Sequence, residues 1–201
     1  MRGKSNRILA CIYLLTIFLL AGCASTKIEG VQKENVNLYE YNNVLISFES
    51  DNLQYKKNLE TAISKKLSHK NIVSLKSSEL FSPLKNYTDT EKSEIIKANK
   101  IGIVLEIKLI STFVNNGGSS TVLMPIGGVL FGSSSNNVNL TMDFDISIFD
   151  MTDGELIFKG TASSTSEDYN FSDCVGNIFE SLASKIVSQY FSAPNQEENE
   201  Q

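Results

Sequence analysis

The chain is poor in the residues that most metal, redox and phosphate sites require. Its 201 residues include one His, three Cys, three Pro and no Trp, and both Arg residues, Arg2 and Arg7, lie near the start. One His and so few Cys exclude zinc sites that draw on several such ligands. The lack of Arg after position 7 argues against bidentate recognition of phosphate or carboxylate groups. No metal and no cofactor is therefore expected.

The sequence from Cys23 onward is strongly acidic. It contains 15 Lys against 23 Asp and Glu, which gives a net charge of −8. Such a charge repels a phosphate backbone, so no nucleic-acid partner is expected. A hydrophobic share of 41% over this length is enough for one domain with a core of its own.

The first 23 residues resemble a bacterial lipoprotein signal. Residues 1–7 are basic, residues 8–20 form an apolar run of 13, and the motif Leu20-Ala21-Gly22-Cys23 follows directly. The run is too short for a helix that spans a bilayer, which needs about 20 apolar residues. The resemblance implies a lipobox, with diacylglycerol attached to the Cys23 sulfur, cleavage between Gly22 and Cys23, and acylation of the new amino group. An ordinary signal peptide or an uncleaved anchor helix is the alternative.

This signal determines where we expect the protein to lie. Residues 1–22 are then removed, residues 23–42 form a flexible tether, and the acyl chains on Cys23 bind membrane lipid at about 0.8 kcal/mol per buried methylene. In Gram-negative lipoproteins an Asp after the lipidated Cys tends to signal retention in the inner membrane, and here that position is Ala24. We therefore expect the outer membrane, facing the periplasm, or the outer face of the plasma membrane in a Gram-positive cell.

One thiol remains in the processed chain. Cys11 departs with the leader and Cys23 is lipidated, so Cys174 has no intramolecular disulfide partner. Cys174 lies near the start of a predicted amphipathic helix, where the helix dipole could lower its pKa and make it reactive. The alternative is that it serves as a small buried hydrophobic residue.

Hydrophobic periodicity predicts an α/β (α+β) domain over residues 43–191 with a single mixed sheet. Apolar and polar residues alternate at 101–109 and 139–148, which indicates half-exposed strands, and Asp153-Gly154 supplies a hairpin turn before a strand at 155–163. The other predicted elements are strands at 43–48 and 71–75 and helices at 53–68, 90–99 and 171–190. The order is β-α-β-α-β-β-β-α, with the first three strands parallel and the helices covering the sheet. Residues 192–201 are polar and acidic, and we expect them to be disordered.

This order resembles the TolB amino-terminal type of α/β domain, which is shared by the curli-secretion lipoprotein CsgG and the penicillin-binding-protein activator LpoB. The likeness covers residues 43–191. It rests on the first strand Val44-Leu45-Ile46-Ser47-Phe48, the amphipathic helix after it, the passage from helix into strand at 95–105, and the terminal hairpin and helix. The resemblance implies a periplasmic domain, tethered by lipid, that binds other envelope proteins or assembles with itself.

Residues 113–137 form a long connection between two predicted strands, and a connection of that length usually has a function. Stretches rich in Gly, Ser and Asn flank an apolar segment, and we expect its side chains to bind the partner: Val122, Leu123, Met124, Ile126, Val129, Leu130 and Phe131. The segment could instead fold over the sheet as a flap and bury its own apolar residues. It could also enter the membrane, as the corresponding insertions of the curli channel do. This last interpretation is the weakest, because a barrel hairpin needs two strands of about 9–11 alternating residues and Pro125 interrupts the run.

The sequence contains no catalytic constellation to which residues can be assigned. His69 lies near the end of a Lys-rich helix, where a cation suits the helix dipole. The acidic residues at 143–155 suggest calcium, but their spacing misses the EF-hand pattern and fits strand alternation and turn chemistry. We expect a non-enzymatic envelope protein that acts as a protein-binding adaptor or assembly factor. The alternatives are a subunit of an oligomeric outer-membrane export complex, and an envelope hydrolase that uses Cys174 or a Ser.

Overall fold

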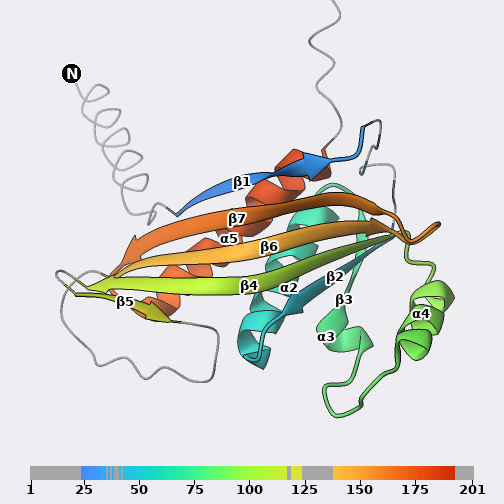
Figure 1. The fold of residues 1–201 in the computed structure, drawn as a ribbon, viewed down its shortest axis with the longest axis horizontal. Coiled ribbons are helices and arrows are strands. Elements are labelled where there is room, and N and C mark those ends of the chain that lie inside the picture. The colour runs from blue at the N-terminus through green and yellow to red at the C-terminus, as the bar shows by residue number, and fades with distance from the viewer. Residues whose placement is uncertain are drawn as a thin grey trace, which may run out of the picture.

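The computed structural model describes residues 24–34, 36, 38, 41, 43–116, 119–123 and 138–192. Over these residues the chain forms one sheet of seven strands together with four helices (Figure 1). In chain order the elements are β1 (Ser25–Gln32), β2 (Asn43–Glu49), α2 (Leu53–Ser68), β3 (Val73–Lys76), α3 (Ser77–Leu80), α4 (Asp89–Ala98), β4 (Ile103–Asn116), β5 (Ser119–Leu123), β6 (Val138–Asp150), β7 (Leu156–Asp168) and α5 (Phe171–Tyr190).

The sheet is mixed, as the sequence predicted. Its strand order is β1-β7-β6-β4-β2-β3, with β5 paired to the final part of β4. Strand β2 runs parallel to β3 and β4, and the other pairings of the described strands are antiparallel. Strands β6 and β7 form the predicted hairpin, and Gly154 in its turn has a φ of 77°, a conformation that Gly adopts without steric cost. The predicted fold class is confirmed.

Helices α2 and α5 pack on one face of the sheet and enclose the main core (Figure 1). The alternation in β2 and β6 sends Ile46, Phe48 and Phe144 toward this face, where each is fully buried. The ring of Phe48 lies 6.1 Å from that of Phe144 and 6.0 Å from that of Phe179 on α5. Each such side chain contributes about 1.5–3 kcal/mol by leaving water, so this layer holds the helices to the sheet.

The opposite face of the sheet is covered only at one end by the described residues. There a second cluster of Leu45, Ile101 and Val104 packs against side chains from α3, α4 and the segment between them. Elsewhere this face includes short polar side chains that bond to one another. The hydroxyls of Thr141 and Thr165 lie 3.1 Å apart, and Ser111 donates to Asp143 at 2.7 Å.

Three side chains mark where the longer helices begin. Asn52 caps α2, Thr88 forms a capping box with Glu91 at the start of α4, and Asn170 accepts from the backbone N–H of Asp173 in α5. None of the helices in the described part of the chain is both long and apolar enough to cross a membrane.

The structure corrects the expectation that residues 23–42 form a flexible tether. Residues 25–32 are strand β1, which pairs with β7 along its whole length. The pattern did not reveal this strand because β1 lies at the edge of the sheet and buries one large apolar side chain, Ile28. The folded domain therefore begins almost directly after Cys23.

The structure also divides the predicted insertion at 113–137. Strand β4 continues to Asn116, well past the predicted end at 109, and β5 turns back to pair with it. The short helix α3 is a further element that the sequence did not predict. The predicted disordered tail lies outside the described residues beyond Ser192.

Candidate functional site

The described residues that adjoin the expected lipidation residue and the expected partner-binding segment lie at the same end of the sheet. Strand pairing aligns Ser25 of β1 with Thr165, Thr165 with Thr141, Thr141 with Phe113, and Phe113 with Val122 of β5. We call the end of the sheet that contains these five residues the β1 rim. Because neighbouring strands lie about 4.8 Å apart, the row from β1 to β4 spans about 15 Å. Figure 1 shows β1 starting, β7 ending and β5 lying at this one end.

Several predicted site residues fall outside the described residues. These are Gly22 and Cys23 of the lipobox and Met124, Ile126, Val129, Leu130 and Phe131 of the apolar segment. The structure places Val122 and Leu123 in β5. The described chain ends at Leu123 in β5 and resumes at Val138, which pairs with Asp168 at the same rim. Both predicted sites therefore connect to the domain at the β1 rim.

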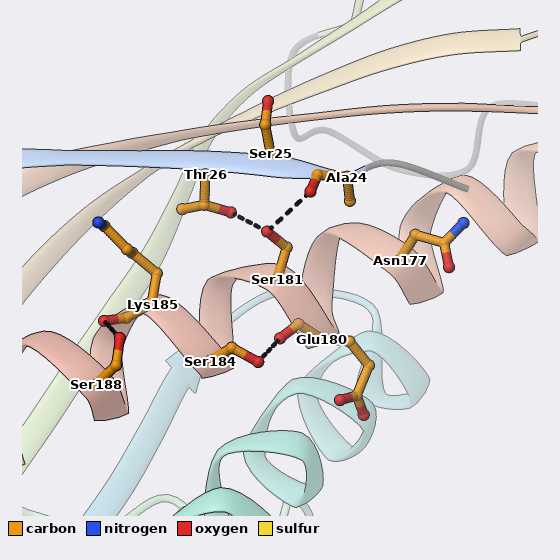
Figure 2. Close-up of a pocket in the computed structure, with 9 residues that line it drawn as sticks. All are labelled: Ala24, Ser25, Thr26, Asn177, Glu180, Ser181, Ser184, Lys185 and Ser188. Carbon is orange, nitrogen blue, oxygen red and sulfur yellow. Dashed lines mark hydrogen bonds between the residues drawn. The ribbon is translucent and has the colours of Figure 1, made fainter. Parts of the chain in front are cut away.

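A groove of about 560 Å³ runs between the start of β1 and helix α5 (Figure 2). It is lined by Ala24, Ser25, Thr26, Asn177, Glu180, Ser181, Ser184, Lys185 and Ser188. The Thr26 hydroxyl lies 2.8 Å from the Ser164 hydroxyl and donates to the Ser181 hydroxyl at 2.8 Å. Ser181 in turn donates to the carbonyl oxygen of Ala24 at 3.5 Å.

These hydroxyl contacts fix the first residues of the domain to both β7 and α5. Thr26, Ser164 and Ser181 were not singled out by sequence reasoning, because isolated Ser and Thr residues carry no pattern. Because of these contacts, the chain continues toward Cys23 from a fixed position on the domain, beside α5.

The environment of Cys174 contradicts the expectation of a lowered pKa. The side chain is fully buried, and its Sγ donates to the carbonyl oxygen of Val138 at 3.3 Å. Burial, and to a lesser extent the Asp168 carboxylate, raises the pKa of the Cys174 thiol above its usual value. The alternative of a small buried hydrophobic residue is confirmed, and the hydrolase hypothesis loses Cys174 as its nucleophile. His69 is exposed at the end of α2 and cannot act on a fully buried thiol.

The acidic residues at 143–155 serve the sheet and its turns. Asp143 accepts from Ser111, Asp150 accepts from Tyr41 and from the backbone N–H of Thr152, and Asp153 accepts from the backbone N–H of Glu155. Partial burial raises the pKa of Asp150, but the hydrogen bonds from Tyr41 and Thr152 outweigh it and hold that pKa below its usual value. Across the described residues, no group of three His, Cys, Asp or Glu side chains is placed to hold a metal ion.

Comparison with known proteins identifies the fold but no family. No protein-family model matches the sequence. No curated protein matches it either. Among solved structures, the subunit of a PelC dodecamer from Paraburkholderia phytofirmans is 10% identical, with a TM-score of 0.51, and the match covers 84% of this chain and 99% of that one.

Two solved structures described as bacterial lipoproteins also match. Lipoprotein GNA1162 from Neisseria meningitidis is 14% identical, with coverage of 73% and 99% and a TM-score of 0.41. A minor lipoprotein from Acinetobacter baumannii is 13% identical, with coverage of 77% and 98% and a TM-score of 0.38. Since every identity is this low, what is shown is a fold shared with the PelC subunit.

Proposed function

We propose that this protein is a lipid-anchored protein of the bacterial cell envelope that acts by binding other proteins and not by catalysis. The observation that carries the proposal is the lipobox motif Leu20-Ala21-Gly22-Cys23 placed two residues before β1. A thiol at this position can carry the lipid, and the strand after it can hold the domain at the membrane.

The proposed location is the outer membrane, with the domain facing the periplasm. It is supported by Ala24 in the position after the lipidated residue. In a Gram-positive cell the same anchor would place the domain on the outer face of the plasma membrane.

The proposed contact surface is the apolar segment from Val122 to Phe131. Strand β5 joins its first two residues to the sheet, so the segment is attached at the β1 rim. An apolar segment in a chain that is otherwise rich in charge is typical of an interface. The proposed partner is another envelope protein or a second copy of this chain.

Two observations support a role without catalysis. The one thiol of the described residues is buried with a raised pKa, which makes it a poor nucleophile. The carboxylates of Asp143, Asp150 and Asp153 accept hydrogen bonds in strand and turn contacts.

The test has two parts. Mass measurement of the N-terminal peptide from membranes should show acyl chains on Cys23, and their absence in wild-type protein would contradict the anchor. Replacing Leu130 and Phe131 by Ser should then remove the proteins that co-purify with the chain. Leu84→Ser is the matched control, because Leu84 is 96% exposed and lies in the segment between α3 and α4. Unchanged co-purification in the double variant would contradict the proposed surface.

A second candidate function is a subunit of a homo-oligomeric export complex in the outer membrane. It is favoured by the similar structure of PelC, which is described as a dodecamer. Extraction in mild detergent followed by mass measurement separates the two candidates, since a ring of many copies is large and an adaptor is small.

A further inference from the structure

Two aromatic side chains are exposed to solvent at the β1 rim. Tyr169, which follows the last residue of β7, is 82% exposed, and Phe113 on β4 is 40% exposed. Phe113 belongs to the row that starts at Ser25, and Tyr169 lies just beyond the pair formed by Asp168 and Val138. Both exposed aromatic residues therefore lie toward the end of the sheet at which β1 begins.

The distance from Cys23 to the domain is short. Only Ala24 separates Cys23 from β1, and two residues of extended chain span about 7 Å. Hydrogen bonds from Thr26 and Ser181 keep this start of β1 on the body of the domain. An acylated Cys23 would thus hold the whole rim close to the lipid headgroups, since the row from Ser25 to Phe113 spans about 15 Å.

We propose that the β1 rim rests on the bilayer surface, with Tyr169 and Phe113 in the headgroup region. Tyr favours this region because its apolar ring and its polar hydroxyl are both accommodated there. The ring of Phe113 is purely apolar and gains by leaving water. The strands then rise from the membrane, and the Asp153-Gly154 turn at the other end of β6 and β7 points away from it (Figure 1). The inference rests on the proposed lipid anchor and adds the orientation of the domain on it.

The charged residues near Tyr169 indicate which lipid headgroups the rim can contact. Three acidic residues lie within four positions of Tyr169 in the sequence: Glu167, Asp168 and Asp173. Anionic headgroups would be repelled by them, so the contact is with zwitterionic headgroups and depends on the rings and the acyl chains.

Because the chain contains no native Trp, the fluorescence of a single introduced Trp reports how close that position lies to the lipid. The full lipidated chain with Tyr169→Trp is reconstituted in vesicles of phosphatidylcholine and phosphatidylethanolamine, with and without bromine on the acyl chains. Leu84→Trp is the control, because Leu84 is also highly exposed but lies in the segment between α3 and α4, away from the end of the sheet where β1 starts (Figure 1). We expect bromine to quench the Trp at position 169 about three-fold more than the Trp at position 84. Phe113→Trp serves as a second probe of the rim.

Each possible result either supports the proposed orientation or overturns it. Equal or stronger quenching at position 84 overturns it, and so does a quenching of the rim probes that increases when phosphatidylglycerol replaces half of the lipid. The mass of the N-terminal peptide from the same sample separates the two proposals. An acylated chain with unquenched rim probes overturns only the orientation, whereas a chain without acyl groups overturns the proposed anchor and the orientation with it.

Discussion

Gly30 of β1 lies directly opposite Gly160 of β7, and their backbones approach so closely that neither residue has room for a side chain. A Cβ atom on Gly160 would lie 2.3 Å from the carbonyl oxygen of Glu29 and 2.8 Å from the Cα atom of Gly30. The ring of Phe158 fills the space beside both glycines and packs on Tyr190 of α5, with 4.6 Å between ring centroids. The two glycines therefore allow the backbone of β1 to approach that of β7 closely at the edge of the sheet.

Replacing Gly160 by Ala should loosen β1. The new methyl group has to displace backbone atoms, and such overpacking costs about 1–3 kcal/mol. Urea unfolding measures the loss. Gly176→Ala on α5 is the control, because a Cβ atom there meets nothing within 4 Å and should raise helix stability by about 0.5–1 kcal/mol. Equal stability of the two variants would contradict the close approach.

Glu60→Gln should destabilise the fold although the change is nearly isosteric. The Glu60 carboxylate is fully buried and accepts hydrogen bonds from the backbone N–H of Phe48 at 3.2 Å, the Ser77 hydroxyl at 2.8 Å and the backbone N–H of Ser78 at 3.0 Å. An amide offers one acceptor oxygen in place of two, so a charged hydrogen bond worth about 1.5–3 kcal/mol is lost. Thermal unfolding should show the loss for Glu60→Gln and almost none for the exposed Glu79→Gln, and a similar shift for both would refute the argument.

Cys174 should resist alkylation in the folded protein. Its thiol is buried and its pKa is raised, so little thiolate forms and no reagent reaches it. Labelling with a small maleimide should follow the rate of global unfolding and become fast only in denaturant. Fast labelling of the native chain at neutral pH would show that the start of α5 opens on its own.

The hydrogen bond from Tyr41 to Asp150 should give stability a pH dependence. The pKa of Asp150 is lower in the folded chain than its ordinary value of 3.8. The carboxylate's contribution is therefore complete at neutral pH and is lost as the pH falls through the folded-state pKa. Tyr41→Phe should cost about 1 kcal/mol at pH 7, and its difference from wild type should shrink below about pH 4. A difference that stays constant from pH 7 to pH 3 would argue against the bond.

Alternation and helical periodicity were sufficient to predict most of the fold. Residues such as Ile103 and Ile107 on β4 and Ile146 on β6 are buried at the alternate positions that predicted them. The terminal helix was predicted for the same reason, since Ile178, Leu182 and Ile186 share one face and are all fully buried.

The parts that were not predicted depend on single contacts between distant residues. Strand β1 has one buried apolar residue, Ile28, and is held by its pairing with β7 and by the contacts of Thr26 with Ser164 and Ser181. Glu60 looks like a surface residue of a Lys-rich helix. Its carboxylate is nevertheless buried and accepts a hydrogen bond from the Ser77 hydroxyl of α3. No local pattern signals either arrangement, because both arise only when the sheet and helices have come together.

The docked start of β1 also bears on how freely the domain could turn on its proposed anchor. On the proposed function, the bond to be cut lies between Gly22 and Cys23, next to a strand held in place through Thr26. Only Ala24 lies between Cys23 and the strand, so a domain anchored through Cys23 would have a pivot of one residue. Such an anchor would restrict the rotation of the domain relative to the membrane, where a long flexible linker would leave it free to tumble.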